Sequence, residues 1–246
     1  MEYFNVPHIP NICSKGVVAD CRISPESVKK LNSLGIEVIL SYKSENLLPP
    51  ISAHPDMTIL HLGGNRFVCS PDSYDYYKER LNGADVARGV CVLKKDYPND
   101  VPYNITIFGE YVFLNASSNQ TEIAKTYVSS SKKILNVKQG YTKCNICVVS
   151  RNALITSDTG IYKTAVDNKI DALLIESGYI ELKGMDCGFI GGASGLIAPN
   201  MLAVNGDIKT HPDGCKMIEF CKKHGVDVIS LKKGILEDIG TILPIF

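Results

Sequence analysis

The sequence carries no excess of charge of either sign. Its 246 residues include 26 Lys and Arg against 26 Asp and Glu, so the formal net charge is zero. Proteins that hold nucleic acid through its phosphates present a basic surface, so this balance predicts no nucleic-acid partner. Hydrophobic residues make up 45% of the chain and charged residues 21%, a composition that favours a packed core over disorder.

Long hydrophobic runs are also missing. Apolar stretches such as residues 172–175 have the length of a strand, far short of the roughly 20 residues that a membrane span needs. Residues 1–7 lack the basic start and apolar core of a signal peptide. Nine cysteines without a secretion signal are typical of reduced thiols. We therefore expect a cytoplasmic protein that has no membrane partner.

Common catalytic and cofactor motifs are absent. The sequence contains no G-x-S-x-G and no H-E-x-x-H. Cys144 and Cys147 form a C-x-x-C, but the second cysteine pair of a structural zinc site is missing. The glycine-rich segment 188–195 does not match a phosphate-binding loop, and its role stays open between a close approach of the backbone to a ligand and a strand kinked by a bulge. We therefore expect no cofactor and no metal.

A repeat organises the rest of the chain. In each copy a polar residue opens a short apolar strand, and a turn, a second strand, a capped helix and a third strand follow. Successive openings are 48, 41, 43 and 50 residues apart. The openings begin at Asp56, Asn104, Asn145, Gly188 and Asp238.

The repeat predicts five strand-strand-helix-strand (ββαβ) units. The first unit lacks its opening strand, and the C-terminal tail supplies an opening strand without a continuation. Pairing of the tail beside Val17–Cys21 would close a ring and remove exposed sheet edges. We predict a single α/β domain over residues 1–246, a five-bladed pseudo-symmetric α/β-propeller closed by its N- and C-terminal strands; an open α/β sheet is the alternative. The predicted units are 17–42 with 237–246, 54–95, 102–138, 143–176 and 187–231.

This architecture resembles the pentein superfamily, the α/β-propeller fold of guanidino-modifying enzymes. The superfamily includes arginine and agmatine deiminases, dimethylarginine hydrolases, amidinotransferases and a ribosome anti-association factor that is no enzyme. Segments Gln139–Cys144 and Gly188–Gly195 are also similar to an uncharacterised clostridial-type branch of it. For the enzymes, the resemblance implies a ligand on the central axis, a Cys that attacks the guanidinium carbon, a His that moves protons and acids that hold the cation.

Carried over to this sequence, the resemblance yields an incomplete catalytic set. Asp56 matches the acidic opening of the enzymes and is a candidate to hold the cation, and Asn104 occupies the next opening, where they often carry an acid. The opening Lys143–Asn145 lacks the expected His, and the opening Glu237–Thr241 lacks the expected Cys. We therefore expect no standard deiminase chemistry.

The candidate site residues lie at or beside these openings. His54 precedes Asp56 and is the candidate acid/base. Cys144 is the candidate nucleophile, because the charge of neighbouring Lys143 would lower the pKa of its thiol. A turn cap for His54 and Asp56, and core packing for the cysteine, are the alternatives. The candidate ligand-binding residues are Asp56, Asn104, Lys143, Cys187 and Asp238.

Three functions follow from these observations. The first is a protein that binds a small polar guanidino- or amide-type ligand at the axis without standard deiminase chemistry. The second is a divergent amidinotransferase- or deiminase-like hydrolase that uses Cys144 and His54, and the third is a protein-binding module like the ribosome factor. A close approach of the Cys144 sulfur to a His54 nitrogen would favour the second function, and bulky apolar side chains filling the axis would favour the third.

Overall fold

The computed structural model describes residues 2–246, and its strands form three-stranded sheets of one repeated connectivity. In each sheet the central strand pairs antiparallel on one side and parallel on the other. The first sheets contain β17 (Leu243–Pro244), β1 (Gly16–Ala19) and β2 (Glu37–Leu40); β3 (Ile59–Gly63), β4 (Arg66–Cys69) and β5 (Asp85–Arg88); and β6 (Thr106–Phe108), β7 (Tyr111–Leu114) and β8 (Lys133–Asn136). The others contain β9 (Cys147–Ser150), β10 (Ala153–Thr156) and β11 (Asp171–Leu174), and β13 (Ser194–Ala198), β14 (Met201–Val204) and β15 (Asp227–Ser230).

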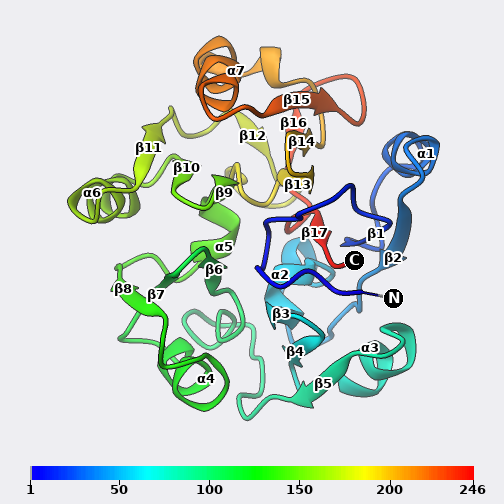
Figure 1. Cartoon of the computed structure of the whole chain (residues 1–246). Coiled ribbons are helices and arrows are strands. Elements are labelled where there is room, and N and C mark those ends of the chain that lie inside the picture. Colours follow the sequence, from blue (N-terminus) through cyan, green and yellow to red (C-terminus); the bar gives the residue numbers. More distant parts are fainter. Residues whose placement is uncertain (1) are drawn as a thin grey trace.

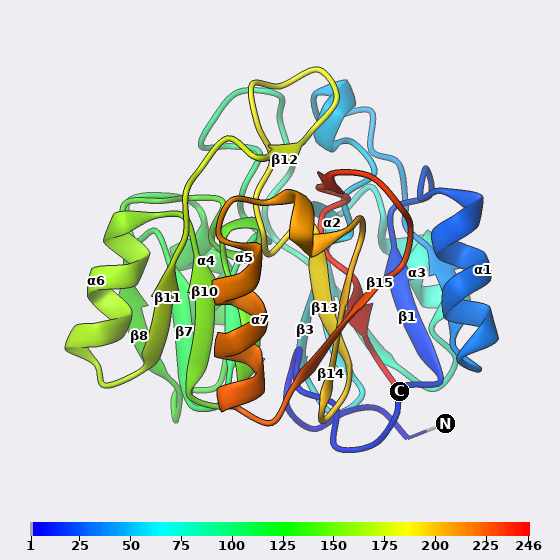
Figure 2. The same ribbon diagram turned by 90° about the horizontal axis from the view of Figure 1, so that it is seen from above.

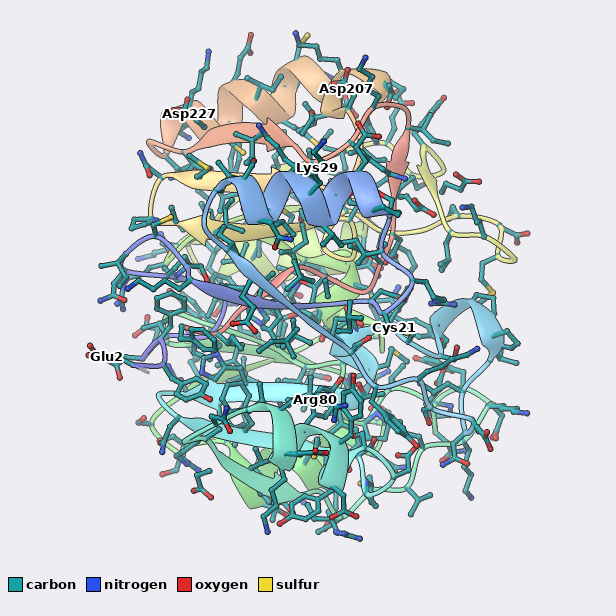
Figure 3. The ribbon with its side chains drawn as sticks, turned by 90° about the vertical axis from the view of Figure 1, so that its right-hand side faces the viewer. Glu2, Cys21, Lys29, Arg80, Asp207 and Asp227 are labelled. Atoms are coloured by element: carbon teal, nitrogen blue, oxygen red, sulfur yellow. The ribbon has the colours of Figure 1, made fainter. Side chains whose placement is uncertain are left out.

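A helix crosses over between the parallel strands of each of these sheets, as a parallel pair requires. Ser24 caps the first helix by accepting a hydrogen bond from the Ser27 backbone, and Pro25 takes the first helical position, where no N–H is needed. The crossover helices lie on the outside of the molecule (Figure 1), and the exposed Lys29 projects from the first of them (Figure 3). They are α1 (Pro25–Ser33), α3 (Tyr74–Arg80), α4 (Gln120–Tyr127), α6 (Thr159–Asp167) and α7 (Gly214–Lys223).

Several short elements complete the fold. The helical turns α2 (Pro55–Thr58) and α5 (Thr142–Asn145) lie toward the middle of the molecule (Figure 1). Strand β12 (Ile180–Glu181) pairs parallel with β16 (Leu236–Glu237), and the loop around β12 lies at the end of the molecule away from the two termini (Figure 2). The 3-10 turns are η1 (Pro49–Ile51) and η2 (Ile208–Thr210).

Five apolar clusters join the sheets in a cyclic order. One cluster packs the β1 sheet against the β3 sheet, the next joins the β3 and β6 sheets, and others join β6 to β9 and β9 to β13. The fifth returns from the β13 sheet to the β1 sheet through Ile197, Ala203 and Val17. Burial of apolar area contributes about 25 cal/mol per Å², so these interfaces are the main stabilising contribution that the fold offers.

The α/β class is confirmed, and so is the pairing of the C-terminal tail with the first strand. Val17 and Val18 pair with Pro244 and Leu243 in antiparallel register. The expected strand openings are partly wrong: residues 56–58 and 144–145 belong to helical turns, and β13 begins only at Ser194. Residues 238–242 form a loop before β17. In residues 2–246 no helix has the length and hydrophobicity to cross a membrane.

Candidate active site

A cavity of about 230 Å³ lies among the loops at the β12 end of the sheets. Its base is formed by His54, Cys144 and Asp238, and its sides include the rings of Tyr141 and Phe189, which stack with centroids 6.3 Å apart. Binding sites for drug-sized ligands usually measure about 300–1,000 Å³, so this cavity suits a smaller molecule.

His54 is positioned by the start of α2 and by the C-terminal loop. It precedes Pro55, the first residue of the helix, and its backbone N–H donates to Ile51 O at 3.2 Å. Gly240 packs against the imidazole with φ of 64°, and a Cβ at that position would collide with the His54 side chain. The loop therefore needs glycine here for both its conformation and its contact with His54.

Cys144 is held at its backbone and at its thiol. The thiol donates to Asp56 Oδ2 at 3.1 Å, and Asn104 Nδ2 donates to the Cys144 sulfur at 3.2 Å. Asn104 Oδ1 also accepts from the Lys143 backbone at 2.8 Å, and Gly192 N–H donates to Cys144 O at 2.9 Å. Asn104 thus links α5 to the thiol through both ends of its amide.

The predicted nucleophile and acid/base come together. Donor atoms of His54, Asp56 and Cys144 all lie within 4.8 Å of one another, and these side chains are at most 3% exposed. Within residues 2–246, neither ring nitrogen of His54 makes a hydrogen bond, and neither does Asp56 Oδ1. Asp56 Oδ2 accepts the hydrogen bond from the Cys144 thiol. This set of a thiol, an imidazole and a carboxylate also has the composition of a metal site, which differs from the expectation of no metal.

Burial controls the protonation of these groups. It raises the pKa of the Asp56 carboxyl to about 7 and lowers the pKa of His54. The pKa of the Cys144 thiol is well above its ordinary value, because of burial and then the nearby carboxylates of Asp56 and Asp238. At neutral pH the free protein therefore holds a protonated thiol beside a neutral imidazole.

The sequence predicts that the charge of Lys143 lowers the pKa of the Cys144 thiol, but the pKa is raised overall, because burial and the nearby carboxylates outweigh that charge. The Lys143 ammonium donates to Gly191 O at 3.1 Å and lines a different, small cavity near His8 and His61. Burial also lowers the pKa of Lys143 itself. Lys143 therefore interacts with the thiol but does not set its protonation state.

Two further carboxylates face the His54 ring. Asp20 Oδ2 lies 3.9 Å from Nε2, and Asp238 Oδ1 lies 3.8 Å from Nδ1. Arg22 holds Asp20 through Nε and Nη2, at 2.9 and 2.6 Å, and the Phe189 backbone donates to Asp238 at 2.9 Å. Both carboxylates therefore have fixed orientations beside the imidazole.

The glycine-rich segment lies against Asp238. A Cβ at Gly188 would collide with the Asp238 side chain, and one at Gly192 would collide with its carboxylate. Gly192 O also accepts from the backbones of Ile239 and Thr241, at 3.1 and 2.8 Å. The segment therefore packs against the C-terminal loop that carries Asp238, a role that neither of the two sequence interpretations gave; its approach to a ligand stays a prediction.

Four of the seven candidate residues line this cavity, namely His54, Cys144, Cys187 and Asp238. Asp56 and Lys143 line the smaller cavity instead, and Asn104 reaches the site through its hydrogen bond to the Cys144 sulfur. Sequence reasoning missed Asp20 and the aromatic pair. Asp20 directly follows the apolar segment Val17–Ala19, so its position at the end of a buried strand was the signal that pointed to it. The catalytic and binding roles of the candidates remain predictions.

The fold is that of the pentein enzymes. Similar solved structures include the inosamine-phosphate amidinotransferase StrB1 from Streptomyces griseus, at 12% identity over 92% of this chain and 90% of that chain, with a TM-score of 0.60. The DDAH from Pseudomonas aeruginosa in complex with citrulline is 12% identical over 89% and 92%, with a TM-score of 0.54. The C. jejuni agmatine deiminase is 9% identical over 94% and 90%, with a TM-score of 0.53.

The sequence itself matches a family model. Residues 18–243 match a family of unknown function (DUF6873), and the chain belongs to that family. None of the curated proteins matches it. The similarity to amidinotransferase, DDAH and agmatine deiminase structures supports the resemblance to the pentein superfamily at the level of the fold, and the clostridial-type branch stays a prediction.

Proposed function

We propose that this protein is a cysteine-dependent enzyme that acts on a small guanidino or amidino cation bound in the cavity. The observation that carries the proposal is the convergence of donor atoms of Cys144, His54 and Asp56 within 4.8 Å, with Cys144 and His54 lining the cavity. A thiol that donates to a carboxylate, beside an imidazole with free nitrogens, has the parts of an activated nucleophile. The fold supports this reaction class by analogy with its enzyme neighbours.

The lining of the cavity supports a planar cation as the ligand. Its charged lining residues are Asp186 and Asp238, both acidic, and the only other titratable groups of its lining are His54, Tyr141 and the cysteines. A guanidinium or amidinium pairs well with a carboxylate and stacks well on an aromatic face. A cation at the base would also favour the thiolate of Cys144 and so offset the neighbouring carboxylates.

The proposed reaction requires one proton transfer in its first half. The sulfur of Cys144 forms a bond to the guanidinium carbon, and the thiol proton passes through Asp56 or His54 to the departing nitrogen. The C–N bond breaks with its electron pair on nitrogen, which leaves ammonia or an amine and a thiouronium on Cys144. In the second half, water or an amine attacks the same carbon and the C–S bond breaks, which returns the thiol.

Binding without chemistry is the second candidate. Burial and the adjacent Asp56 and Asp238 carboxylates hold the pKa of the Cys144 thiol well above its ordinary value, which favours the unreactive thiol. This function would use the same cavity and the same cation. The protein-binding alternative has less support, because a cavity remains open beside His54, Cys144 and Asp238, although apolar side chains such as Leu182 and Phe189 also line it.

The proposal is tested with alkylguanidines and alkylamidines, and alkylureas of the same shape serve as neutral controls. A ligand at 100 times its dissociation constant stabilises the protein by about 2.7 kcal/mol, which thermal unfolding detects. We expect the cations to stabilise both the wild type and Cys144→Ser, and only the wild type to release ammonia or amine. If the cations stabilise the wild type but it releases no ammonia or amine, binding without chemistry is the function. Stabilisation by the ureas alone would overturn the proposal that the ligand is a cation.

The finer architecture is also a proposal. We propose that residues 1–246 form one domain, a five-bladed pseudo-symmetric propeller. The cyclic order of the apolar clusters supports it, since the β13 sheet packs on the β1 sheet and the tail pairs with β1. The nine cysteines have free thiols, which fits the cytoplasmic location that we propose.

A further inference from the structure

We propose that His54, Asp56 and Cys144 bind a single zinc ion, and that this ion takes the cysteine out of chemistry. The inference goes beyond the proposed function and does not need turnover to be true. The three side chains offer one nitrogen, one oxygen and one sulfur ligand. Zinc accepts all three ligand types and is a common ion at cysteine and histidine ligands, whereas magnesium and calcium prefer oxygen alone.

The spacing of the donor atoms suits zinc after a small closure. Tetrahedral zinc with bonds of about 2.0–2.3 Å places neighbouring ligand atoms about 3.3–3.8 Å apart. The Cys144 sulfur and Asp56 Oδ2 are 3.1 Å apart, and no pair in the set exceeds 4.8 Å. Side-chain rotations that move the donor atoms by about 1 Å would therefore bring them to three of the four ligand positions of a tetrahedral zinc ion. Cys144 and His54 line the cavity, which gives the ion access and leaves the fourth position for water.

Unpartnered buried atoms supply a second, independent observation. His54 is 1% exposed, and neither of its ring nitrogens has a hydrogen-bond partner in the described part of the chain; the same holds for Asp56 Oδ1. A buried polar atom without a partner costs about 1–3 kcal/mol. An ion at this point would give the imidazole the partner that the protein does not.

The surrounding groups form the outer contacts that metal sites require. A zinc-bound histidine usually donates its second N–H to a carboxylate, which fixes the ring. Here Asp20 faces Nε2 at 3.9 Å and Asp238 faces Nδ1 at 3.8 Å, so a carboxylate is available whichever nitrogen binds the metal. Asn104 donates to the Cys144 sulfur at 3.2 Å, the contact expected for a bound thiolate.

Zinc binding and nucleophilic attack exclude each other. The ion binds the thiolate, so the thiol proton of Cys144 leaves to solvent, together with any proton on Asp56. The sulfur lone pair that would attack a guanidinium carbon is then used in the Zn–S bond. The site is therefore sensitive to free zinc, and removal of the metal restores the thiol.

The experiment uses cobalt(II) as a spectroscopic probe on the reduced, metal-free full chain, followed by displacement with zinc. We expect one equivalent of cobalt to give a thiolate-to-metal charge-transfer band and one equivalent of zinc to abolish it. Cys144→Ser should lose the band, and Cys147→Ser, a buried cysteine of β9 outside the three-residue set, should keep it. His54→Gln should weaken binding more than about 100-fold, since loss of an outer contact alone costs 10- to 100-fold.

Each other result decides against the site. A band that survives in Cys144→Ser would assign the metal to other thiols, such as the exposed Cys13 and Cys215. Unchanged cobalt affinity in His54→Gln, with thermal unfolding showing a folded variant, or the absence of saturable binding, would also overturn it. The two proposals fail separately, because metal binding is measured without substrate and turnover is measured after chelation. Turnover without metal binding removes only the zinc site, and metal binding without turnover removes only the enzyme.

Discussion

Two buried polar clusters share Asp56 and differ in what can reach them. On the cavity side, Cys144 and His54 line a space of about 230 Å³. On the other, Asp56, His8 and His61 line a space of about 10 Å³, which is enough for one water at most. Both clusters contain buried histidines with unpartnered nitrogens. Access, and not the presence of buried polar groups, separates a candidate reaction site from internal structure.

The second cluster is tied to the fold by direct contacts. His61 Nε2 lies 2.8 Å from Gly64 O, and the imidazole stacks on Phe67 with centroids 4.4 Å apart. Asn5 O lies where a Cβ on Gly63 would be, so the N-terminal segment that carries His8 packs tightly on this end. The comparison supports the proposed chemical role of His54 and favours a structural role for His61.

Matched histidine variants give the largest test of this contrast. We expect His54→Gln to lower turnover of a cationic substrate by about 10²- to 10⁴-fold, because proton transfer by a positioned side chain contributes that much. His61→Gln keeps a donor toward Gly64 O and should change turnover less than threefold. Steady-state turnover rates of the two folded variants test this prediction. A similar loss of turnover in both would contradict the proposed difference between the clusters.

The stability of the fold at acid pH should depend on His61, which we expect to have little effect on turnover. Burial lowers the pKa of His61 to about 4. Between about pH 6.5 and 4 the unfolded chain takes up a proton that the folded chain does not, so stability falls as the pH falls through this range. His61→Gln removes this contribution. Urea unfolding at pH 7 and pH 4.5 should show the loss of stability reduced by up to about 3 kcal/mol relative to wild type; an unchanged loss would show that His61 does not carry it.

A substitution at Gly192 tests whether Asp238 contributes to ligand binding. A Cβ at Gly192 collides with the Asp238 carboxylate, so Gly192→Ala should cost about 1–3 kcal/mol and displace Asp238 from His54. Gly35→Ala is the control, because its φ of 76° is strained for alanine but its surroundings are open. We expect the control to lose stability without losing ligand binding. Equal ligand binding by both variants would show that Asp238 has no part in the site.

The smallest effect concerns the thiol. The carboxylate of Asp56 is one cause of the high pKa of Cys144, so Asp56→Asn should lower that pKa. The rate of iodoacetamide alkylation against pH, measured on chelated protein, reports the change as a shift of the profile to lower pH. Cys144→Ser identifies the alkylated residue. A profile that does not move would mean that burial alone sets the thiol pKa.

Much of the framework was readable from the sequence. The repeat spacing predicted the strands and the pairing of the tail with the first strand, because turns and apolar periodicity are local signals. The helical turns that hold His54 and Cys144 were not predicted. They depend on distant partners, such as the bond from the Asp56 backbone to Gly240 O, and no local pattern reports such a contact.

The candidate site shows the same division. His54 and Cys144 were identified because polar residues at strand openings share one end of the sheets. The direction of the thiol pKa differs from the prediction, because burial and the carboxylates of Asp56 and Asp238 outweigh the charge of the adjacent Lys143. Asp20 was missed because its proximity to His54 is a contact between segments that are far apart in the sequence.

The pairing of β17 with β1 leaves the two ends of the described chain near each other (Figures 1 and 2). A short linker that joins the two ends would leave the core packing unchanged. New ends opened in an exposed turn elsewhere would leave the strand pairing of every sheet unchanged. The geometry of the cavity therefore does not depend on the order of the segments in the sequence. We expect a circularly permuted chain to keep the same arrangement of His54, Asp56 and Cys144.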